Sequence, residues 1–523
     1  MLRSIRTTGR RGRRVVLTAA VAMSVLLPAL ARPTADAAPS APPTRPELAS
    51  TEQIMSTVRD LVGFAPRSTG SVGGLRAAEY VADRFRRAGL TDVHYETATA
   101  YDWNATGASL EVGGRVIDSF PITHSFIAGA DIPSTRTLGP DGATAPVVDI
   151  GAGGVGNADV KGKWVLFDLK FRLPLAALIP LMTFFWDPQL TLLDPATLLS
   201  ANPYITNQAS VVKAAQAKGA LGVIGVLSDY FDSNRYRNEF YRRSPMTVPG
   251  VWVTKKEGAL LRQRLQTTPV ATMRMTVERK AVTARTVVGF LEGRTKDTVM
   301  VQSHHDSQGP GAVEDGTGTA EVIALADYYG AKARQPGYRP REKTLMFTTF
   351  DTHFTGYQQH TAFAKKYVVE KRTPYRIVAN TTIEHVGKRA VIGKDGSLQT
   401  LERTEPRGIF ENLNLPLKLA LARALVRNDL RSTAVLNGTL PAFLGGIPTD
   451  ASFALITGIP VVSLIAGPLY MYDDADTLDK VDQAQLRPVA TFFADVLDAI
   501  ERTPSAAIGL GPLLSPDPAR ALG

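Results

Sequence analysis

The spacing of apolar residues predicts two amphipathic helices early in the chain. Apolar residues recur every three or four positions over 51–62 and again over 75–90, the period of an α-helix with one buried face. Gly89 is placed to close the second helix, since glycine accepts the left-handed conformation that often ends helices. A short strand is predicted next, at 93–96.

Two stretches of alternating strand and helix follow. The first, about 140–280, has a helix at 210–218 and strands predicted at 147–150, 164–168, 222–227 and 250–254. The second, about 283–503, has strands ending at Ser303, Phe350, Thr382 and about Ile465, with helices at 319–329, 361–371 and 415–426. Short strands between helices indicate an α/β fold with a doubly wound, mostly parallel sheet.

The segment 171–188 departs from this pattern because it is strongly apolar. Pro174 and Pro180 argue against a membrane-spanning helix here. Plain packing, a lid, a wall of a substrate site and an exposed apolar patch all remain open for it.

The N-terminus is typical of an exported protein. Six arginines precede an apolar run at 15–31, and Ala35-Asp36-Ala37 then forms a small-x-small cleavage site, which predicts a signal peptide over 1–37. Arg13-Arg14 followed by apolar residues resembles a twin-arginine signal. We therefore expect a secreted protein with no stable membrane span after cleavage, and the open alternative is an uncleaved anchor.

Composition excludes several functional classes. The chain has 523 residues, of which 44% are hydrophobic and 21% charged, so it is globular and long enough for two domains. It has no cysteine, which excludes disulfides, thiol nucleophiles and cysteine-based zinc sites. Most of the net charge of +10 lies in 1–37, so the mature chain is nearly neutral and we expect no nucleic-acid partner.

Histidines and carboxylates gather just beyond the predicted strand ends. His304, His305, His353 and His385 each follow a strand, and in an open α/β sheet these ends face one crevice. The nearby acids are Asp306, Glu314, Asp315, Glu384, Asp450, Asp473 and Asp476. Imidazole with oxygen ligands suits zinc or a similar divalent ion. The alternative is a solvated polar rim without metal.

These residues resemble the co-catalytic zinc aminopeptidase and glutamate carboxypeptidase family (clan MH metallopeptidases). The resemblance rests on the strand end His304-His305-Asp306, the loop GAVEDGTG at 311–318 and the closing stretch GIPVVSL…DADTLDKVD. The early stretch PRSTGS…AAEYVADRFRRAGL is also typical of the family. VKGKWVLFDLK, KAAQAKGALGVIGVL and the turn 248–250 resemble a protease-associated domain, which many family members carry as an insertion.

The resemblance implies a zinc-exopeptidase-like sheet interrupted by a smaller α/β or β-rich domain. The expected parts are a signal peptide (1–37), a linker (38–47), a peptidase-like domain in two pieces (48–139 and 281–503), the inserted protease-associated-like domain (140–280) and a flexible tail (504–523).

The family holds two zinc ions, and the resemblance implies which residues remain for them. His304 and Glu384 stand at the private ligands of one ion. Glu314 stands at the carboxylate that bridges both ions, with Asp315 as the alternative. Asp306 would orient His304 through its other ring nitrogen.

The positions for the second ion have changed. His353-Phe354 replaces the family's pair of glutamates, of which the first is the general base and the second a ligand. Tyr472 stands where the family's last histidine ligand belongs. The resemblance therefore implies a site with one zinc ion. His353 is open as general base, fourth ligand or neither, and Tyr472 as an oxyanion donor or a packed side chain. His385 is expected to support the site rather than bind metal. The acidic run at 473–482 is expected to form a turn that leads into a helix, with Asp476-Thr477 as the cap, and calcium binding is the open alternative.

These observations predict a secreted, zinc-dependent hydrolase of peptide or related amide bonds, aminopeptidase-like by resemblance. The alternative is a non-catalytic binding protein on the same scaffold, and single-zinc acyl transfer is a third reading. No oligomeric state follows from the sequence.

Overall fold

The structure is a computed structural model that describes residues 47–129, 131–237 and 245–510. The predicted signal peptide, all but the last residue of the predicted linker and residues 511–523 lie outside the described residues. The described part of the chain forms one compact unit. No helix in these residues has both the length and the apolarity needed to cross a membrane.

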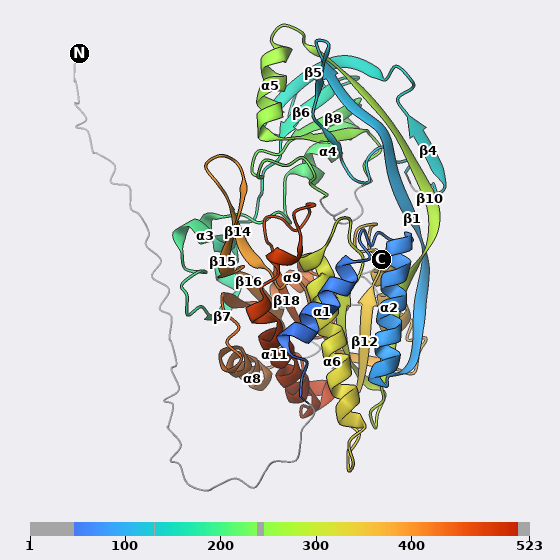
Figure 1. Ribbon diagram of the computed structural model, residues 1–523, viewed down its shortest axis with the longest axis vertical. Coiled ribbons are helices and arrows are strands. Elements are labelled where there is room, and N and C mark those ends of the chain that lie inside the picture. The colour runs from blue at the N-terminus through green and yellow to red at the C-terminus, as the bar shows by residue number, and fades with distance from the viewer. Residues whose placement is uncertain (1–46, 130, 238–244, 511–523) are drawn as a thin grey trace, which may run out of the picture. The chain divides into compact units, whose positions relative to one another are not determined.

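Two long antiparallel strands run through both parts of this unit. β1 (Thr91–Val112) and β10 (Val270–Leu291) pair along nearly their whole length and run from one part of the fold into the other (Figure 1). Only 93–96 was predicted as a strand here. The observed strand is longer because β10, almost 200 residues away, satisfies its backbone hydrogen bonds.

The central sheet of the peptidase-like part is mixed and mostly parallel, as predicted. Its strand order is β10-β12-β11-β13-β18-β16-β17-β7. The strands are β11 (Asp297–His304), β12 (Thr344–Phe350), β13 (Arg376–Ile383), β16 (Arg407–Glu411), β17 (Thr433–Asn437) and β18 (Val461–Ala466). β11 pairs in parallel with both β12 and β13, and β13 pairs in parallel with β18. The carboxyl ends of these four strands therefore meet at one edge of the sheet.

Residues between β1 and β10 build a second layer of strands. Its order is β3-β9-β8-β6-β5, with β5 joining the first residues of β10. The strands are β3 (Phe120–Pro121), β5 (Ala143–Gly151), β6 (Trp164–Asp168), β8 (Gly222–Val226) and β9 (Gly250–Val253), with β2 (Arg115–Ile117) and β4 (Ser134–Thr137) on β1 and β10. The four predicted strands of this region are present. That it is a protease-associated domain stays a prediction.

Five helices pack over one face of the central sheet around a shared apolar core (Figure 1). They are α1 (Thr51–Val62), α2 (Val72–Ala88), α6 (Gly318–Ala333), α8 (Leu415–Arg427) and α11 (Gln483–Glu501). The opposite face carries α7 (Gln358–Ala364) followed by a further turn to Val369, packed on Phe350 and Ile377. The remaining helices are α3 (Pro195–Leu199), α4 (Gln208–Ala217), α5 (Lys255–Leu265), α9 (Thr439–Phe443) and α10 (Ser452–Ile456).

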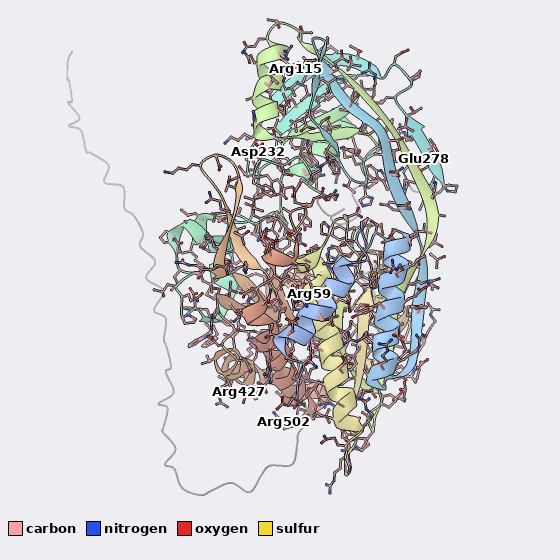
Figure 2. The ribbon with its side chains drawn as sticks, in the orientation of Figure 1. Arg59, Arg115, Asp232, Glu278, Arg427 and Arg502 are labelled. Carbon is pink, nitrogen blue, oxygen red and sulfur yellow. The ribbon has the colours of Figure 1, made fainter. Side chains whose placement is uncertain are left out.

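Local signals explain where the helices begin and end. The Ser50 hydroxyl accepts the N–H of Gln53 and the Gln53 side chain accepts the N–H of Ser50, a reciprocal cap that starts α1. Gly89 ends α2 with φ of 87°, as predicted. Arg59 and Arg427 lie in the last turns of α1 and α8, where a cation suits the helix dipole (Figure 2).

The apolar segment 171–188 contributes packing through its second half, whereas its first residues border a cavity. It forms a 3-10 turn at Leu175–Leu181 and the strand β7 (Met182–Trp186). β7 pairs antiparallel with β17, so a segment that lies within the predicted insertion completes the edge of the central sheet. The start of the predicted flexible tail is also packed: Ile508 is fully buried, and its carbonyl accepts the N–H of Asn414.

Candidate metal centre

The strand ends bring the predicted site residues together. His304 is the last residue of β11, Glu384 and His385 directly follow β13, and His353 lies three residues beyond β12. These side chains are almost completely buried. The neighbouring parallel strands explain the convergence, because adjacent carboxyl ends project their loops toward the same space.

One group of three side chains is arranged to hold a cation. A ligand atom from each of His304, Glu314 and His385 lies within 4.8 Å of the others. The Nε2 of His304 is 3.5 Å from Glu314 Oε1, and the Nε2 of His385 is paired with Glu314 Oε2. The two imidazoles thus approach the same carboxylate.

Both imidazoles are held through their other nitrogen. Nδ1 of His304 donates to the carbonyl oxygen of Asp306 at 3.1 Å, and the Asp306 carboxylate lies 3.3 Å away. Nδ1 of His385 donates to the carbonyl oxygen of Ala466 at 2.7 Å. With Nδ1 donating to a carbonyl, Nε2 is the nitrogen that faces Glu314, and it would bind a metal once it has given up its proton. The hydrogen bond goes to the backbone carbonyl of Asp306, and that its carboxylate orients His304 stays a prediction.

The loop that carries Glu314 is fixed from two distant segments. The Asp476 carboxylate accepts the N–H groups of Val313 and Glu314, both at 2.9 Å. The predicted cap at Asp476-Thr477 is wrong: the Thr477 side chain makes no capping bond, and α11 begins only at Gln483. The turn instead faces inward, because its carboxylate satisfies buried backbone donors of the loop.

Arg67 fixes the other side of this region. Its guanidinium is fully buried and donates to the carbonyls of His305, Pro310 and Gly311 at 2.8–3.0 Å, and to that of Leu61 at 3.3 Å. Burial lowers the pKa of Arg67 to about 10. Sequence reasoning missed Arg67, and it named Asp476 as a nearby acid and a helix cap but not as a support of the Glu314 loop. Arg67 lies in the stretch PRSTGS and Asp476 in the stretch DADTLDKVD, both typical of the family. The sequence does not show which loop either side chain contacts.

A second group lies beside the first and shares one residue with it. His304, His353 and Asp450 also offer ligand atoms within 4.8 Å of one another. However, Nδ1 of His353 already donates to Asp450 Oδ1 at 2.9 Å, and Nε2 of His360 donates to Asp450 Oδ2 at 2.8 Å. The rings of His304 and His353 stack with centroids 3.9 Å apart. Asp450 and His360 thus form a network behind His353, and neither was assigned a role from the sequence.

The remaining predicted ligands, Asp315 and Glu384, lie near the metal centre but accept hydrogen bonds from other groups. Both oxygens of Asp315 accept hydrogen bonds from the surrounding scaffold, from Ser303 at 2.5 Å and from the N–H groups of Gly318 and His385 at 3.0 and 3.2 Å. Oε1 of Glu384 accepts the N–H of Asp450 at 3.0 Å. Neither acid is in the two groups, so their roles as metal ligands stay predictions, whereas His385 takes a place that the sequence assigned to Glu384.

The residues at the second-ion positions are packed around the centre. The centroid of the Phe354 ring lies 6.1 Å from the centroid of the His304 ring and 5.0 Å from that of the His353 ring. Tyr472 is 3% exposed and packs edge-on against Tyr236. Together with Glu314, Phe354 and Tyr472 line a cavity of about 10 Å³. That Tyr472 donates to a reacting oxygen stays a prediction.

Electrostatics show strong mutual attraction within the centre. Burial alone would lower the pKa of His385, but the paired Glu314 raises it to about 10. Burial would raise the pKa of Glu314, yet His385 and His304 hold it well below its usual range. Behind His353, burial and the nearby Asp450 raise the pKa of Glu384 well above its usual value.

The donor set fits zinc. The Nε2 atoms of His304 and His385 and both oxygens of Glu314 are buried, and among the described residues these atoms face one another rather than any other hydrogen-bond partner. Such atoms are costly to bury unless they are paired or bind a metal. Two imidazole nitrogens and a carboxylate are a common set of three protein ligands for zinc.

Comparison with known families is decisive for the part of the chain that holds this centre. The model of peptidase family M28 matches residues 286–497. These residues form an M28 peptidase domain. The resemblance to co-catalytic zinc peptidases is thereby confirmed, and zinc is the ion that the family supports. No curated protein matches the sequence.

Solved structures share the fold of the M28 domain and its surroundings. An aminopeptidase from Aneurinibacillus sp. strain AM-1 is 20% identical with a TM-score of 0.55, covering 89% of this chain and 95% of that one. A zinc aminopeptidase from Bacillus subtilis is 17% identical with a TM-score of 0.58, covering 89% and 99%. A peptidase M28 precursor from Shewanella amazonensis SB2B is 18% identical with a TM-score of 0.60, covering 88% and 98%. At these identities the likeness establishes the fold.

Proposed function

We propose that the chain is an exported, aminopeptidase-like hydrolase of peptide bonds that works with one zinc ion held by His304, Glu314 and His385. Membership of the M28 domain in a peptidase family supports a metal-dependent peptide hydrolase. The observation that carries the proposal is the convergence of two oriented Nε2 atoms on one buried carboxylate. A zinc ion there would supply Lewis-acid chemistry, polarising a peptide carbonyl and activating water.

The proposal of a single ion is supported by the way the two candidate groups share His304. Its Nδ1 is committed to Asp306, so only Nε2 remains, and the two groups compete for it. His353 and Asp450 already satisfy each other through a 2.9 Å hydrogen bond. The group around Glu314 is therefore the one that we assign to zinc, with Phe354 and Tyr472 occupying the space of a second ion's ligands.

His353 is the side chain that we assign to proton transfer. Asp450 accepts the proton on Nδ1, which leaves Nε2 as the basic nitrogen, 3.7 Å from Glu314 Oε1. Asp450 is itself held ionised because burial, which would raise its pKa, is outweighed by His360 and His353. An ionised carboxylate behind an imidazole fixes its tautomer and stabilises its protonated form, as a general base requires.

A binding protein without catalysis is the second candidate. It is favoured by the changes at three positions of the resembled family. Phe354 and Tyr472 replace the two ligands of the second ion, and His353 replaces the general base. Such a protein would keep the fold and the zinc centre but would not turn over peptides. The test must therefore measure metal and hydrolysis separately.

The test is elemental mass spectrometry of the purified mature protein together with hydrolysis of aminoacyl-p-nitroanilides. We expect one zinc per chain, lost in His304→Ala and in His385→Ala. The matched control is His94→Ala, on β1 and partly exposed, which should keep its zinc. His353→Ala should keep zinc but lose about 100-fold or more in kcat.

Two zinc ions per chain would contradict the single-metal assignment. One ion without hydrolysis of any peptide substrate would leave the binding protein as the function. Loss of zinc in Glu384→Gln but not in His385→Ala would restore Glu384 as the third ligand.

A further inference from the structure

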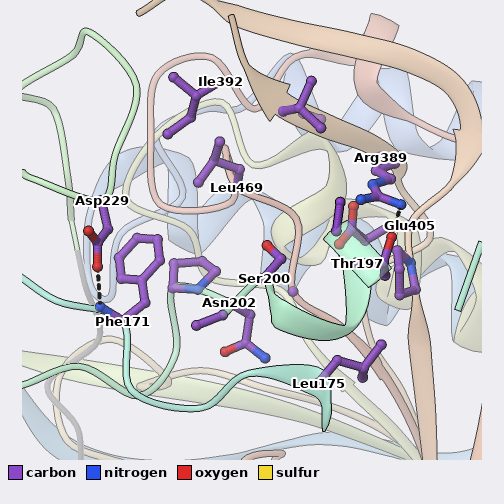
Figure 3. Close-up of a pocket in the computed structure, with 17 residues that line it drawn as sticks. Phe171, Leu175, Thr197, Ser200, Asn202, Asp229, Arg389, Ile392, Glu405 and Leu469 are labelled. Atoms are coloured by element: carbon purple, nitrogen blue, oxygen red, sulfur yellow. Dashed lines mark hydrogen bonds between the residues drawn. The ribbon is translucent and has the colours of Figure 1, made fainter. Parts of the chain in front are cut away.

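A second cavity, apart from the metal centre, lies between the predicted insertion and the peptidase-like part. It has a volume of about 240 Å³. Its walls come from α3 and the residues after it, from the strand β14 (Lys388–Ile392), from 405–406 just after β15 (Leu398–Thr404), and from the loop 467–469 (Figure 3). Nothing in the proposed hydrolysis uses it.

One end of the cavity carries a cation with spare hydrogen-bond capacity. The Arg389 side chain is 10% exposed and lines the cavity. Among the described residues its guanidinium donates to Thr197 alone, and the nearest carboxylate, that of Asp194, is 4.0 Å away. A guanidinium has five N–H donors, so most of its donors have no protein acceptor. Planar carboxylates are the groups that arginine binds best.

Glu405 lies beside Arg389 at the same end (Figure 3). Its Oε2 is buried and has no hydrogen-bond partner among the described residues. Burial raises its pKa to about 8, although Arg389 and the N–H of Ala390 act to lower it. Near neutral pH the side chain is then mainly a protonated acid with an O–H to donate. A guanidinium and a carboxylic acid together make a donor-rich end for an anion.

The other end and the middle of the cavity differ in character. Asp229 lies at the far end, with Oδ1 paired to Lys170 at 2.6 Å and Oδ2 accepting the N–H of Phe171 at 3.0 Å (Figure 3). Each carboxylate oxygen has a second lone pair, so Asp229 can accept further donors. Between the two ends the wall is mixed: Phe171, Leu175 and Leu469 supply apolar surface, and Ser200 and Asn202 supply polar groups (Figure 3).

We propose that this cavity binds a free amino acid with an apolar side chain, its carboxylate on Arg389 and Glu405 and its ammonium toward Asp229. The arrangement of cation, partly apolar wall and carboxylate matches the order of charges in such a zwitterion. The volume suits one amino acid rather than a long chain. The site does not depend on the proposed function, although peptide hydrolysis would produce this class of ligand.

The cavity and the metal centre are neighbours in the fold. Leu469 lies three residues after Ala466, whose carbonyl holds His385. A Cβ at Gly467 would lie 2.8 Å from both Asn202 and Tyr204, so the loop is packed tightly against the wall of the cavity. Binding at one place must therefore be separated experimentally from binding at the other.

The experiment is a calorimetric titration of the mature chain with L-leucine. Arg389→Gln should weaken binding about 10- to 100-fold, the usual loss for a hydrogen bond to a charged group. The control Arg403→Gln removes an exposed arginine of the same hairpin and should leave binding unchanged. Leucinamide, which lacks the carboxylate, and 4-methylvalerate, which lacks the ammonium, should each bind at least about 10-fold more weakly.

All titrations are repeated in His304→Ala, which we expect to lose zinc. Leucine binding that persists there supports the proposal whatever the outcome for hydrolysis. Binding that disappears there would place leucine at the metal centre and overturn the proposal. No binding at about 10 mM leucine, equal binding of 4-methylvalerate, or no effect of Arg389→Gln would also overturn it. If Arg389→Gln does not fold, Ser200→Phe, which fills the cavity from its exposed rim, must abolish binding instead.

Discussion

Single buried side chains hold the loops of the metal centre in place. Arg67 is the clearest case, since one guanidinium satisfies four backbone carbonyls, among them those of His305 and Gly311. Among the described residues the carbonyls of His305 and Pro310 have no other hydrogen-bond partner, so without Arg67 they would be unpaired. The carbonyls of Leu61 and Gly311 also accept backbone N–H groups. Hydrogen bonds from a charged donor are among the stronger contributions to stability, and their loss exposes the full desolvation cost of the acceptors.

Replacing Arg67 by lysine should therefore destabilise the protein. A lysine keeps the charge but offers a single ammonium and cannot reach four carbonyls in a plane. We expect the free energy of unfolding to fall by about 3 kcal/mol. Urea denaturation measures it, with Arg86→Lys on the exposed face of α2 as the control. A change in Arg67→Lys no larger than in the control would show that the loop does not depend on this residue.

Glu405 should make stability depend on pH. Its pKa is raised in the folded protein to about 8, whereas the unfolded value is near 4.5. The folded state thus holds a proton that the unfolded state releases, and its stabilising effect is lost as pH rises from about 4.5 through 8. Glu405→Gln has no such loss, so its stability relative to the wild type should increase by about 4 kcal/mol between pH 5 and about pH 9. Thermal melts at pH 5 and about pH 9 test this; equal differences at both values would contradict it.

At the scale of elements, the centre is assembled from loops that lie far apart in the sequence. The turn at Asp476 belongs to the closing stretch of the M28 domain, yet it shapes the backbone that presents Glu314. Positioning groups of this kind affect metal affinity although they do not touch the ion.

Asp476→Asn should weaken zinc binding while the protein stays folded. An amide has one oxygen, so its NH₂ would face the N–H of Val313 or Glu314. We expect an affinity for zinc about 10-fold lower, measured by competition with a chromophoric chelator. Asp479→Asn is the matched control, because Asp479 is an exposed acid of the same stretch. Equal affinities in the two variants would remove Asp476 from the support of the site.

The apolar segment 171–188 also acquires its role at this scale. β7 adds an antiparallel strand to the edge of the central sheet, and Trp186 donates its indole N–H to Asp429 at 2.9 Å. The segment is apolar because the side chains of β7 pack on both faces of this sheet edge, with Phe184 and Trp186 against one core and Met182 and Phe185 against the other.

At the scale of the whole molecule, β1 and β10 connect the two layers of strands. Each is 22 residues long and contributes to both layers. If one layer unfolded alone, the continuous pairing of β1 with β10 would be disrupted. The two layers should therefore not unfold independently.

We therefore expect residues 47–510 to unfold in one calorimetric transition, with the calorimetric and van't Hoff enthalpies in agreement. The measurement is differential scanning calorimetry of the zinc-free protein, which removes the stabilisation that zinc adds to one layer only. Two resolved transitions would show that the predicted insertion at 140–280 is an independent domain.

The sequence by itself determined the periodic elements, the sheet type and the candidate residues of the centre. Helix and strand periods depend on neighbours a few positions apart, and for that reason α1, α2 and most strands of both series were predictable. His304 and Glu314 were predictable because the strand ends of a parallel sheet converge. The tertiary structure alone decided the choice among neighbours: His385 instead of Glu384 beside Glu314, Asp315 turned into the scaffold, Arg67 and Asp476 on the loops. Those choices depend on which nitrogen or oxygen finds a partner once the chain has folded, and the pattern of apolar and polar positions does not contain that information.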